Sequence, residues 1–384
     1  MRFVFGRAAK RESEMTGIKI LTVRGIEVKI HVTFPLILVV AAVQFGLSEG
    51  GFSLAGAAFG VLVTLILFAC VVIHELSHSL ASTQMGFPVK DIVLLPLGGV
   101  AQMERVPESP GQELIMAVVG PLSNVVIAAL LSGVGLLLGG GINLQIDLTR
   151  PGWEDVLSYL ILTNLGLAIF NLIPAFPMDG GRVLRALLAT VMSHARATAI
   201  AVNVGQGLAW LLGLAGLLGQ NFLWILVAVF VYVGASQEGQ MAQVKDVLRG
   251  LRVGQVFSRH PLVLSPEDPV SHAVDLTLES FQADFPVCDG KHIVGLLTHT
   301  DVLRALKQGR PEASVREVMQ TDFPTARLND ELFETHQQMT EAELGALPVV
   351  DKGYFLGLLT RRDVSEVYHL LSISPELLAQ RRGA

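Results

Sequence analysis

The sequence predicts a polytopic α-helical membrane domain with six transmembrane helices, followed by a soluble α/β region that contains two copies of one module. Three observations predict this class. Hydrophobic residues make up 51% of the 384 residues and charged residues only 16%, which is too apolar for an ordinary soluble protein. Long windows without a charged residue fill the first part of the chain. The last part repeats itself at a constant offset of 62 residues.

Each charge-free window is long enough to cross the hydrocarbon core of a bilayer. The windows cover residues 30–48, 52–73, 114–146, 156–178 and 197–237. The last window is too long for one crossing, and Gly219, Gln220 and Asn221 in its middle predict a turn between two helices. We therefore expect six spans between residues 30 and 237, the first of them interrupted by polar residues and a proline.

The distribution of lysine and arginine predicts the orientation of the spans. These residues gather in the N-terminal segment and in the even-numbered connections: Arg2, Arg7, Lys10, Arg11, Lys19, Arg24, Lys29, Lys90, Arg105, Arg182, Arg185 and Arg196. The connections on the opposite side contain only Arg150. The positive-inside rule places the N-terminus in the cytoplasm, and six crossings return the C-terminal region to that side. We expect a multi-pass protein of a bacterial or archaeal cell membrane.

Other features of the sequence argue against alternative classes. No cleavable signal peptide is predicted, because the first apolar stretch begins at Ile30 and lacks a small-residue cleavage pattern behind it. With only Cys70 and Cys288, a disulfide framework is not expected. The formal net charge of −6 gives no reason to expect a nucleic-acid partner.

The second span ends in His74, Glu75, Leu76, Ser77 and His78, an HExxH motif. Residues four apart share one face of a helix, so the two histidines can offer imidazole nitrogens to a single ion, with Glu75 beside them. Ionisable side chains within a span are costly and by default mark a functional site. The motif therefore predicts a zinc site in which Glu75 acts as a general base.

A catalytic zinc ion needs a third protein ligand and an open position for water. The fourth span runs into Asn171-Leu-Ile-Pro-Ala-Phe-Pro-Met-Asp179-Gly180, where Asp179 is the first acidic residue after a long uncharged stretch. Two prolines break the helix there and can turn the carboxylate inward. A solvated carboxylate at a helix end is the alternative reading of Asp179.

HExxH in one span and NxxPxxPxDG in a later one together resemble the site-2 protease family. This resemblance implies one zinc ion per chain, held by His74, His78 and Asp179, and a water activated by Glu75. It also implies hydrolysis of peptide bonds in or near transmembrane segments, as in regulated intramembrane proteolysis, with single-span membrane proteins as substrates. A transporter or a metal-binding regulator is the rival class, because buried His, Glu and Asp can also form an ion path.

Two further elements match the family. Gly120-Pro-Leu-Ser-Asn124 resembles its GPxxN element, in which the asparagine faces the active site; Asn124, with Asn171 of the second motif, is a candidate for contacting the substrate backbone or the oxyanion. Asn124 could instead form a hydrogen bond between helices. Residues 93–101 resemble the family's membrane-dipping hairpin, whose edge strand can pair with an extended substrate; an ordinary buried hairpin is the alternative.

The repeated module resembles the CBS domain, and two copies form the usual tandem pair. Nine residues recur at the offset of 62, from Pro286 and Pro348 through the two GLLTxxD motifs. The resemblance implies an adenine nucleotide, ATP, ADP or AMP, bound through four residues, and dimerisation through the CBS domains. These residues are Thr298, Asp301, Thr360 and Asp363. Alternatively, they could cap the helices that follow.

The expected domain plan covers the whole chain. It consists of a cytoplasmic N-terminal segment (1–29), a six-span intramembrane metalloprotease domain (30–237), a linker (238–251), two CBS domains (252–310 and 311–371) and a C-terminal tail (372–384). Nucleotide binding is expected to modulate cleavage.

Overall fold

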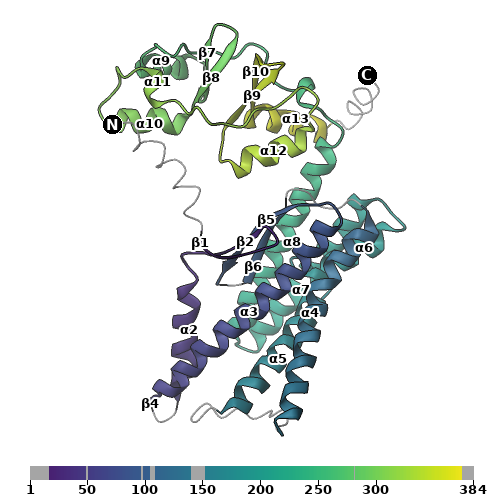
Figure 1. Cartoon of the computed structure of the whole chain (residues 1–384). Coiled ribbons are helices and arrows are strands. Elements are labelled where there is room, and N and C mark those ends of the chain that lie inside the picture. The colour runs from purple at the N-terminus through teal and green to yellow at the C-terminus, as the bar shows by residue number, and fades with distance from the viewer. Residues whose placement is uncertain are drawn as a thin grey trace. The chain divides into compact units, whose positions relative to one another are not determined.

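The computed structural model describes residues 17–48, 51–96, 98–103, 109–139, 152–280 and 282–373. The chain divides into two compact units, residues 1–239 and residues 240–384 (Figure 1). Several predictions fall outside the described residues: those on Arg2, Arg7, Lys10, Arg11, Arg105 and Arg150, and most of the C-terminal tail.

The N-terminal unit is built from helices, one of which continues into the second unit. They are α2 (Pro35–Gly46), α3 (Leu54–Gln84), α4 (Pro110–Leu137), α5 (Trp153–Asn171), α6 (Asp179–Ala189), α7 (His194–Leu218) and α8 (Phe222–Leu248). Among the described residues, α3, α4, α5, α7 and α8 are long and apolar enough to cross a membrane. The turn predicted at residues 219–221 is confirmed, because α7 and α8 are separate helices there.

The structure therefore shows five candidate spans, and length alone does not give the predicted sixth. Helix α2 has 12 residues, which is about 18 Å, whereas the hydrocarbon core is about 30 Å thick. Helix α2 is shorter than the predicted first span because the first residues of that span are not helical. Strand β2 (Ile26–Ile30) ends where the first apolar window begins, and the helix starts only at Pro35, whose fixed φ suits the first turn of a helix.

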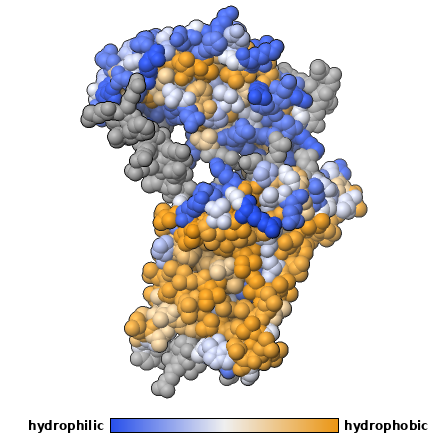
Figure 2. Space-filling view, viewed as in Figure 1, coloured by the Kyte–Doolittle hydropathy of each residue, from blue (hydrophilic) through white to orange (hydrophobic). Residues whose placement is uncertain are grey.

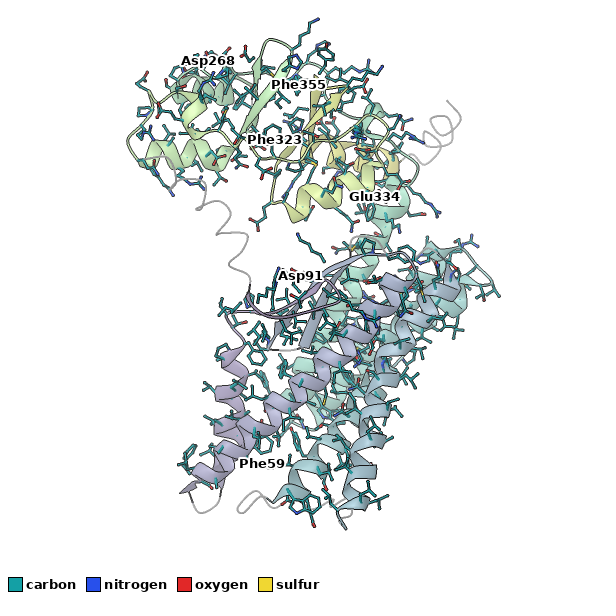
Figure 3. The ribbon with its side chains drawn as sticks, in the orientation of Figure 1. Phe59, Asp91, Asp268, Phe323, Glu334 and Phe355 are labelled. Atoms are coloured by element: carbon teal, nitrogen blue, oxygen red, sulfur yellow. The ribbon has the colours of Figure 1, made fainter. Side chains whose placement is uncertain are left out.

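A four-stranded sheet lies at one end of this unit, where Figure 3 labels Asp91. Its strands run in the order β1 (Ile18–Val23), β2, β5 (Val89–Leu95) and β6 (Gly98–Met103), and β2 pairs with β5 in parallel while the other pairs are antiparallel. Because β2 leads into α2 and β5 follows α3, these two helices form a hairpin whose open ends both lie at the sheet.

The N-terminal strand pair was missed at the level of sequence, although residues 18–23 and 26–30 are rich in β-branched and apolar residues around an Arg24-Gly25 turn. Both turn residues have positive φ, 49° and 91°. On the face of β2 and β5 away from the core, Lys29 Nζ lies 2.6 Å from a carboxylate oxygen of the buried Asp91.

The surface of the N-terminal unit carries a broad apolar band in the view of Figure 2. Large apolar side chains on its helices are more than half exposed, including Leu36, Val39, Leu130, Ile169, Trp210, Leu211 and Phe222. Contiguous exposed apolar surface of this extent is typical of contact with lipid. At the end of the unit away from the sheet, the rings of Phe45, Phe59 and Tyr159 pack together, with Phe59 labelled in Figure 3.

The C-terminal unit contains the two predicted copies of the module. The first has α9 (Val270–Ser280), β7 (Phe285–Asp289), β8 (His292–Leu297) and α10 (His299–Lys307); the second has α12 (Leu332–Glu341), β9 (Ala346–Asp351), β10 (Tyr354–Thr360) and α13 (Arg361–Ile373). The short elements η2 (Val253–Gln255) and α11 (Val315–Val318) complete the unit. Leu264 pairs in parallel with Val287, as Ala326 does with Val349, so the repeat of 62 residues is structural. The final turns of α8 pack in the core of the second copy.

Candidate metal centre

Two histidines on α3 and one aspartate at the start of α6 converge inside the N-terminal unit. His74 and His78 are buried, and their Nε2 atoms lie 3.1 Å apart. Asp179 Oδ2 lies 3.3 Å from Nε2 of His74 and 3.2 Å from Nε2 of His78. The loop after α5 contains Pro174 and Pro177, which end that helix and allow Asp179 to begin the next one beside α3.

These three side chains fit a zinc ion. Their ligand atoms all lie within 4.8 Å of one another, and no other such group of His, Cys, Asp or Glu occurs in the part of the chain that the structure describes. Zinc binds N and O ligands at about 2.0–2.1 Å in a tetrahedron, which puts neighbouring ligand atoms about 3.3 Å apart. The three separations, 3.1, 3.2 and 3.3 Å, match this spacing and leave the fourth corner without a protein ligand.

Gly120 on α4 provides the space for both imidazoles. A Cβ atom at this position would overlap Nε2 of His78 and lie 2.8 Å from Cε1 of His74. Any side chain at residue 120 would therefore occupy the place where the two histidines meet. This gives the GPxxN sequence a steric reason for its glycine.

The other ring nitrogen of each histidine is held by α4. His78 Nδ1 lies 2.5 Å from the backbone carbonyl oxygen of Met116, and His74 Nδ1 lies 2.5 Å from Oδ1 of Asn124. A carbonyl oxygen can only accept, so His78 donates its proton from Nδ1 and keeps the lone pair of Nε2 for a metal.

The asparagines predicted for substrate contact occupy different positions. Asn124 is fully buried, and its amide bonds His74 on one side and Asn164 on the other, with a separation of 2.9 Å between Nδ2 of Asn124 and Oδ1 of Asn164. This geometry favours the interhelical alternative for Asn124. Asn171 ends α5 half-buried, and among the described residues it forms no hydrogen bond to the three candidate ligands.

Glu75 lies beside the edge strand β6. A Cβ atom on Gly99 would lie 2.6 Å from Cγ of Glu75, so the glutamate side chain packs directly on the backbone of the predicted hairpin. Within the described residues, the carboxylate of Glu75 forms no hydrogen bond. It is therefore available to a water or substrate group placed between the ligand cluster and β6.

The loop before Asp179 is held in place by α8 and by a buried arginine. Arg185 Nε and Nη1 donate to Glu113 and Glu238 at 2.6 and 2.7 Å, and its Cζ lies 4.9 Å from the centre of the Phe176 ring. Gly234 of α8 leaves space for Pro177. From the sequence, Arg185 contributes only to the predicted orientation and this network is not predicted, although an arginine and two glutamates beside apolar windows are a signal of it.

We expect Arg185→Met to destabilise the N-terminal unit by about 3–5 kcal/mol, because it removes the cation that Glu238 and the buried Glu113 share and leaves Glu113 only its contact with His194 Nε2 at 3.3 Å. Thermal unfolding of the detergent-solubilised protein measures the change. The matched control is Arg196→Met, which removes an exposed arginine of α7 that has no ion pair among the described residues. Equal unfolding midpoints for the two variants would contradict the structural role of Arg185.

The predicted nucleotide residues of the C-terminal unit cap helices. Thr298 accepts a hydrogen bond from the backbone N–H of Asp301 and donates to Oδ2 of that residue at 2.5 Å; Thr360 and Asp363 repeat the arrangement at 2.7 Å. The carboxylate of the buried Asp301 also accepts from Arg304 and Gln320. Asp363 is less buried and uses only Oδ2 within the described residues.

The two modules differ where they meet. Asp284 of the first module corresponds to Ala346 of the second, and burial raises the pKa of the Asp284 carboxyl above its ordinary value while the backbone N–H of His299 donates to it. A cavity of about 400 Å³ in this unit is lined instead by residues around the β9–β10 turn: Thr325, Arg327, Val350, Asp351, Lys352 and Gly353. None of the four predicted nucleotide residues lines it.

Both the N-terminal and the C-terminal part of the chain are similar to known proteins. The profile of peptidase family M50 matches residues 62–145 and 139–212, and that of the CBS domain matches residues 253–308 and 315–370. A zinc metalloprotease of Methanocaldococcus jannaschii is 32% identical over 360 residues, which cover 94% of this chain and 98% of that protein.

Two solved structures are also similar. A site-2 protease from Methanocaldococcus jannaschii is 38% identical and covers 58% of this chain and 95% of its own, with a TM-score of 0.44. A CBS domain pair in complex with 5′-methylthioadenosine and S-adenosyl-L-methionine is 21% identical and covers 31% of this chain and 96% of its own, with a TM-score of 0.29.

Proposed function

The chain belongs to peptidase family M50 and is a zinc metalloprotease with a tandem pair of CBS domains, and from this membership we propose that it cleaves membrane proteins in or near their transmembrane segments. The observation that carries the proposal is the buried cluster of His74, His78 and Asp179, which begins on a helix long and apolar enough to cross a membrane. Glu75 adjoins this cluster on the same helix. Burying two histidines and a carboxylate within an apolar helix bundle costs free energy, so such a cluster indicates a functional site.

In this proposal His74, His78 and Asp179 hold the zinc ion. When bound, zinc polarises the scissile carbonyl and lowers the pKa of a water molecule toward about 7. Glu75 accepts the proton of the attacking water as the new C–O bond forms, then donates it to the amine nitrogen as the C–N bond breaks. The contact of Glu75 with Gly99 keeps its carboxylate on the side of β6, where an extended peptide can reach it.

The substrate is proposed to bind as an added strand on β6. This strand is at the edge of the sheet, since β6 pairs with β5 alone among the described strands. A helical peptide hides its carbonyls in its own hydrogen bonds, so cleavage requires a locally extended segment. Single-span proteins already trimmed by another protease are the proposed substrates.

The proposed topology has six crossings, with both the N-terminus and the CBS pair in the cytoplasm of a bacterial or archaeal cell. Support comes from the hairpin of α2 and α3, whose two open ends both lie at the sheet, as a first crossing by α2 requires. The side chains of Lys19, Lys29 and Lys90 lie at the sheet end of this hairpin, where the positive-inside rule expects them.

Cleavage of a panel of single-span model substrates by the purified protein in detergent tests the proposed function. We expect specific cuts within or beside the span, and their loss when a zinc chelator is added. The opposite result is a protein that binds one zinc ion per chain and cuts none of the substrates, but carries zinc across the membrane of liposomes into which it is inserted. The protein would then be a transporter and not a protease.

The CBS pair is proposed to bind an adenine nucleotide, to modulate cleavage and to form a homodimer. Thr360 and Asp363 are the better candidates for ribose contact, because the Asp301 carboxylate is already occupied by Arg304 and Gln320. Dimerisation is supported by exposed apolar side chains on three helices of the unit: Leu278, Leu303, Leu306, Leu370 and Ile373.

We expect Asp363→Ala to weaken binding of the preferred nucleotide by about tenfold or more, since a hydrogen bond to a charged group contributes about 1.5–3 kcal/mol. Calorimetric titration of the whole protein with ATP, ADP and AMP measures the affinity. Asp322→Ala, at an exposed position of the same module, is the control. Equal cleavage rates with and without a saturating nucleotide would remove the regulatory part of the proposal.

A further inference from the structure

A chain of hydrogen bonds leads from the metal centre to the backbone of α5. His74 Nδ1 lies 2.5 Å from Oδ1 of Asn124, Asn124 Nδ2 donates to Oδ1 of Asn164 at 2.9 Å, and Asn164 Nδ2 donates to the carbonyl oxygen of Leu160 at 2.8 Å. Both asparagines are fully buried. The chain crosses three helices, because α4 packs against both α3 and α5 (Figure 1).

The end of this chain gives it a direction. The carbonyl oxygen of Leu160 can only accept, so the amide of Asn164 must turn its nitrogen toward Leu160 and its oxygen toward Asn124. Asn124 must then donate from its nitrogen and present its oxygen to His74. The oxygen of Asn124 can only accept, so Nδ1 of His74 must carry the proton. The lone pair of His74 Nε2 is then free and is directed toward Asp179 and His78.

We infer that Asn164 is a positioning residue that fixes the tautomer of His74 through Asn124. His78 needs no such relay, because its Nδ1 faces the carbonyl oxygen of Met116 directly. Without Asn164, the amide of Asn124 is free to turn over and present its nitrogen to His74. The proton of His74 would then move to Nε2, the atom that the metal requires. Outer hydrogen-bond partners of this kind change metal affinity or activity by about 10–100-fold.

The test compares three single variants of the full-length protein in detergent. Asn164→Leu removes both hydrogen bonds at similar volume. Asn164→Asp keeps an acceptor toward Asn124 in either protonation state, and its protonated form also donates to Leu160. Thr163→Val is the matched control on α5, because the Thr163 hydroxyl bonds only backbone carbonyls of its own helix among the described residues.

Zinc affinity by competition with a chromogenic chelator is the main readout, with kcat and KM for a model substrate and the unfolding midpoint of the metal-free protein beside it. We expect Asn164→Leu to weaken zinc binding by about 10–100-fold without raising KM. Asn164→Asp and Thr163→Val should bind zinc as the parent protein does. A lower midpoint of metal-free Asn164→Leu with unchanged zinc affinity would overturn the inference, because Asn164 would then act only in folding.

The inference rests on the proposed role of His74 as a zinc ligand, and His74→Ala separates the two. If His74→Ala binds zinc normally, the proposed metal centre itself fails. If His74→Ala loses zinc and Asn164→Leu does not, the metal centre stands and the relay fails. Failure of Asn164→Asp to restore affinity lost in Asn164→Leu would also overturn the relay.

Discussion

Replacement of Glu75 by glutamine is expected to reduce cleavage by about 10²–10⁴-fold while the protein still binds one zinc ion per chain. The amide has the shape of the carboxylate but cannot take a proton from water. The candidate ligands His74, His78 and Asp179 are untouched by the change, so zinc binding should persist. The measurements are the cleavage rate of a single-span substrate and the zinc content of the same preparation.

Ser77→Ala is the control for this variant, since Ser77 lies two residues away on α3 and its hydroxyl bonds the backbone carbonyl of Ile73. It should cleave like the parent protein. Cleavage by Glu75→Gln at close to the parent rate, still sensitive to a chelator, would show that another group acts as the base. If cleavage by both the parent protein and Glu75→Gln were insensitive to the chelator, a contaminating protease would be responsible instead.

Replacement of Gly120 by alanine is expected to remove zinc binding and cleavage together. The new methyl group would overlap Nε2 of His78 and lie 2.8 Å from Cε1 of His74, so the two imidazoles could not both keep their positions. They have little freedom to retreat, because α4 holds both rings through their Nδ1 atoms. Zinc content after dialysis and the cleavage rate measure the effect.

Gly133→Ala on the same helix is the matched control, because a Cβ at residue 133 meets nothing within 4 Å. Alanine favours helix more than glycine by about 1 kcal/mol, so this control should be as stable as the parent protein or more stable. Full zinc binding by Gly120→Ala would mean that the histidines can bind metal in a different arrangement from the one described.

The meeting of His74, His78 and Asp179 could be predicted from the sequence, because each of the two segments that supply them carries a recognisable local pattern. The spacing of His74 and His78 fixes their common helix face, and the prolines before Asp179 mark the break that turns it inward. The partner of each Nδ1 atom could not be predicted in this way. An asparagine in a span signals a polar contact, but Asn164 and Asn124 meet only through the packing of α4 on α5.

The N-terminal strands show a different limit. Searching for charge-free windows finds helices that face lipid. Strand β1 contains Lys19, and β2 alternates Glu27 and Lys29 with apolar residues, so both strands escape such a search. The same strands shorten the first helix. The capping role of Thr298 and Asp301 was visible as an alternative, and the contacts of Arg304 and Gln320 that occupy the carboxylate came only with the folded module.

Helix α8 limits where this chain can be divided into fragments. In the middle of α8, Gly234 leaves space for Pro177 in the loop before Asp179, and Glu238 binds Arg185. In its last turn, Leu248 packs in the core of the C-terminal unit. A fragment that ends before residue 238 would lose a carboxylate that Arg185 binds, and a fragment that begins after residue 248 would lose a buried side chain of the C-terminal core. Neither unit can therefore be separated within the predicted linker, residues 238–251, at an arbitrary residue without losing one of its own contacts.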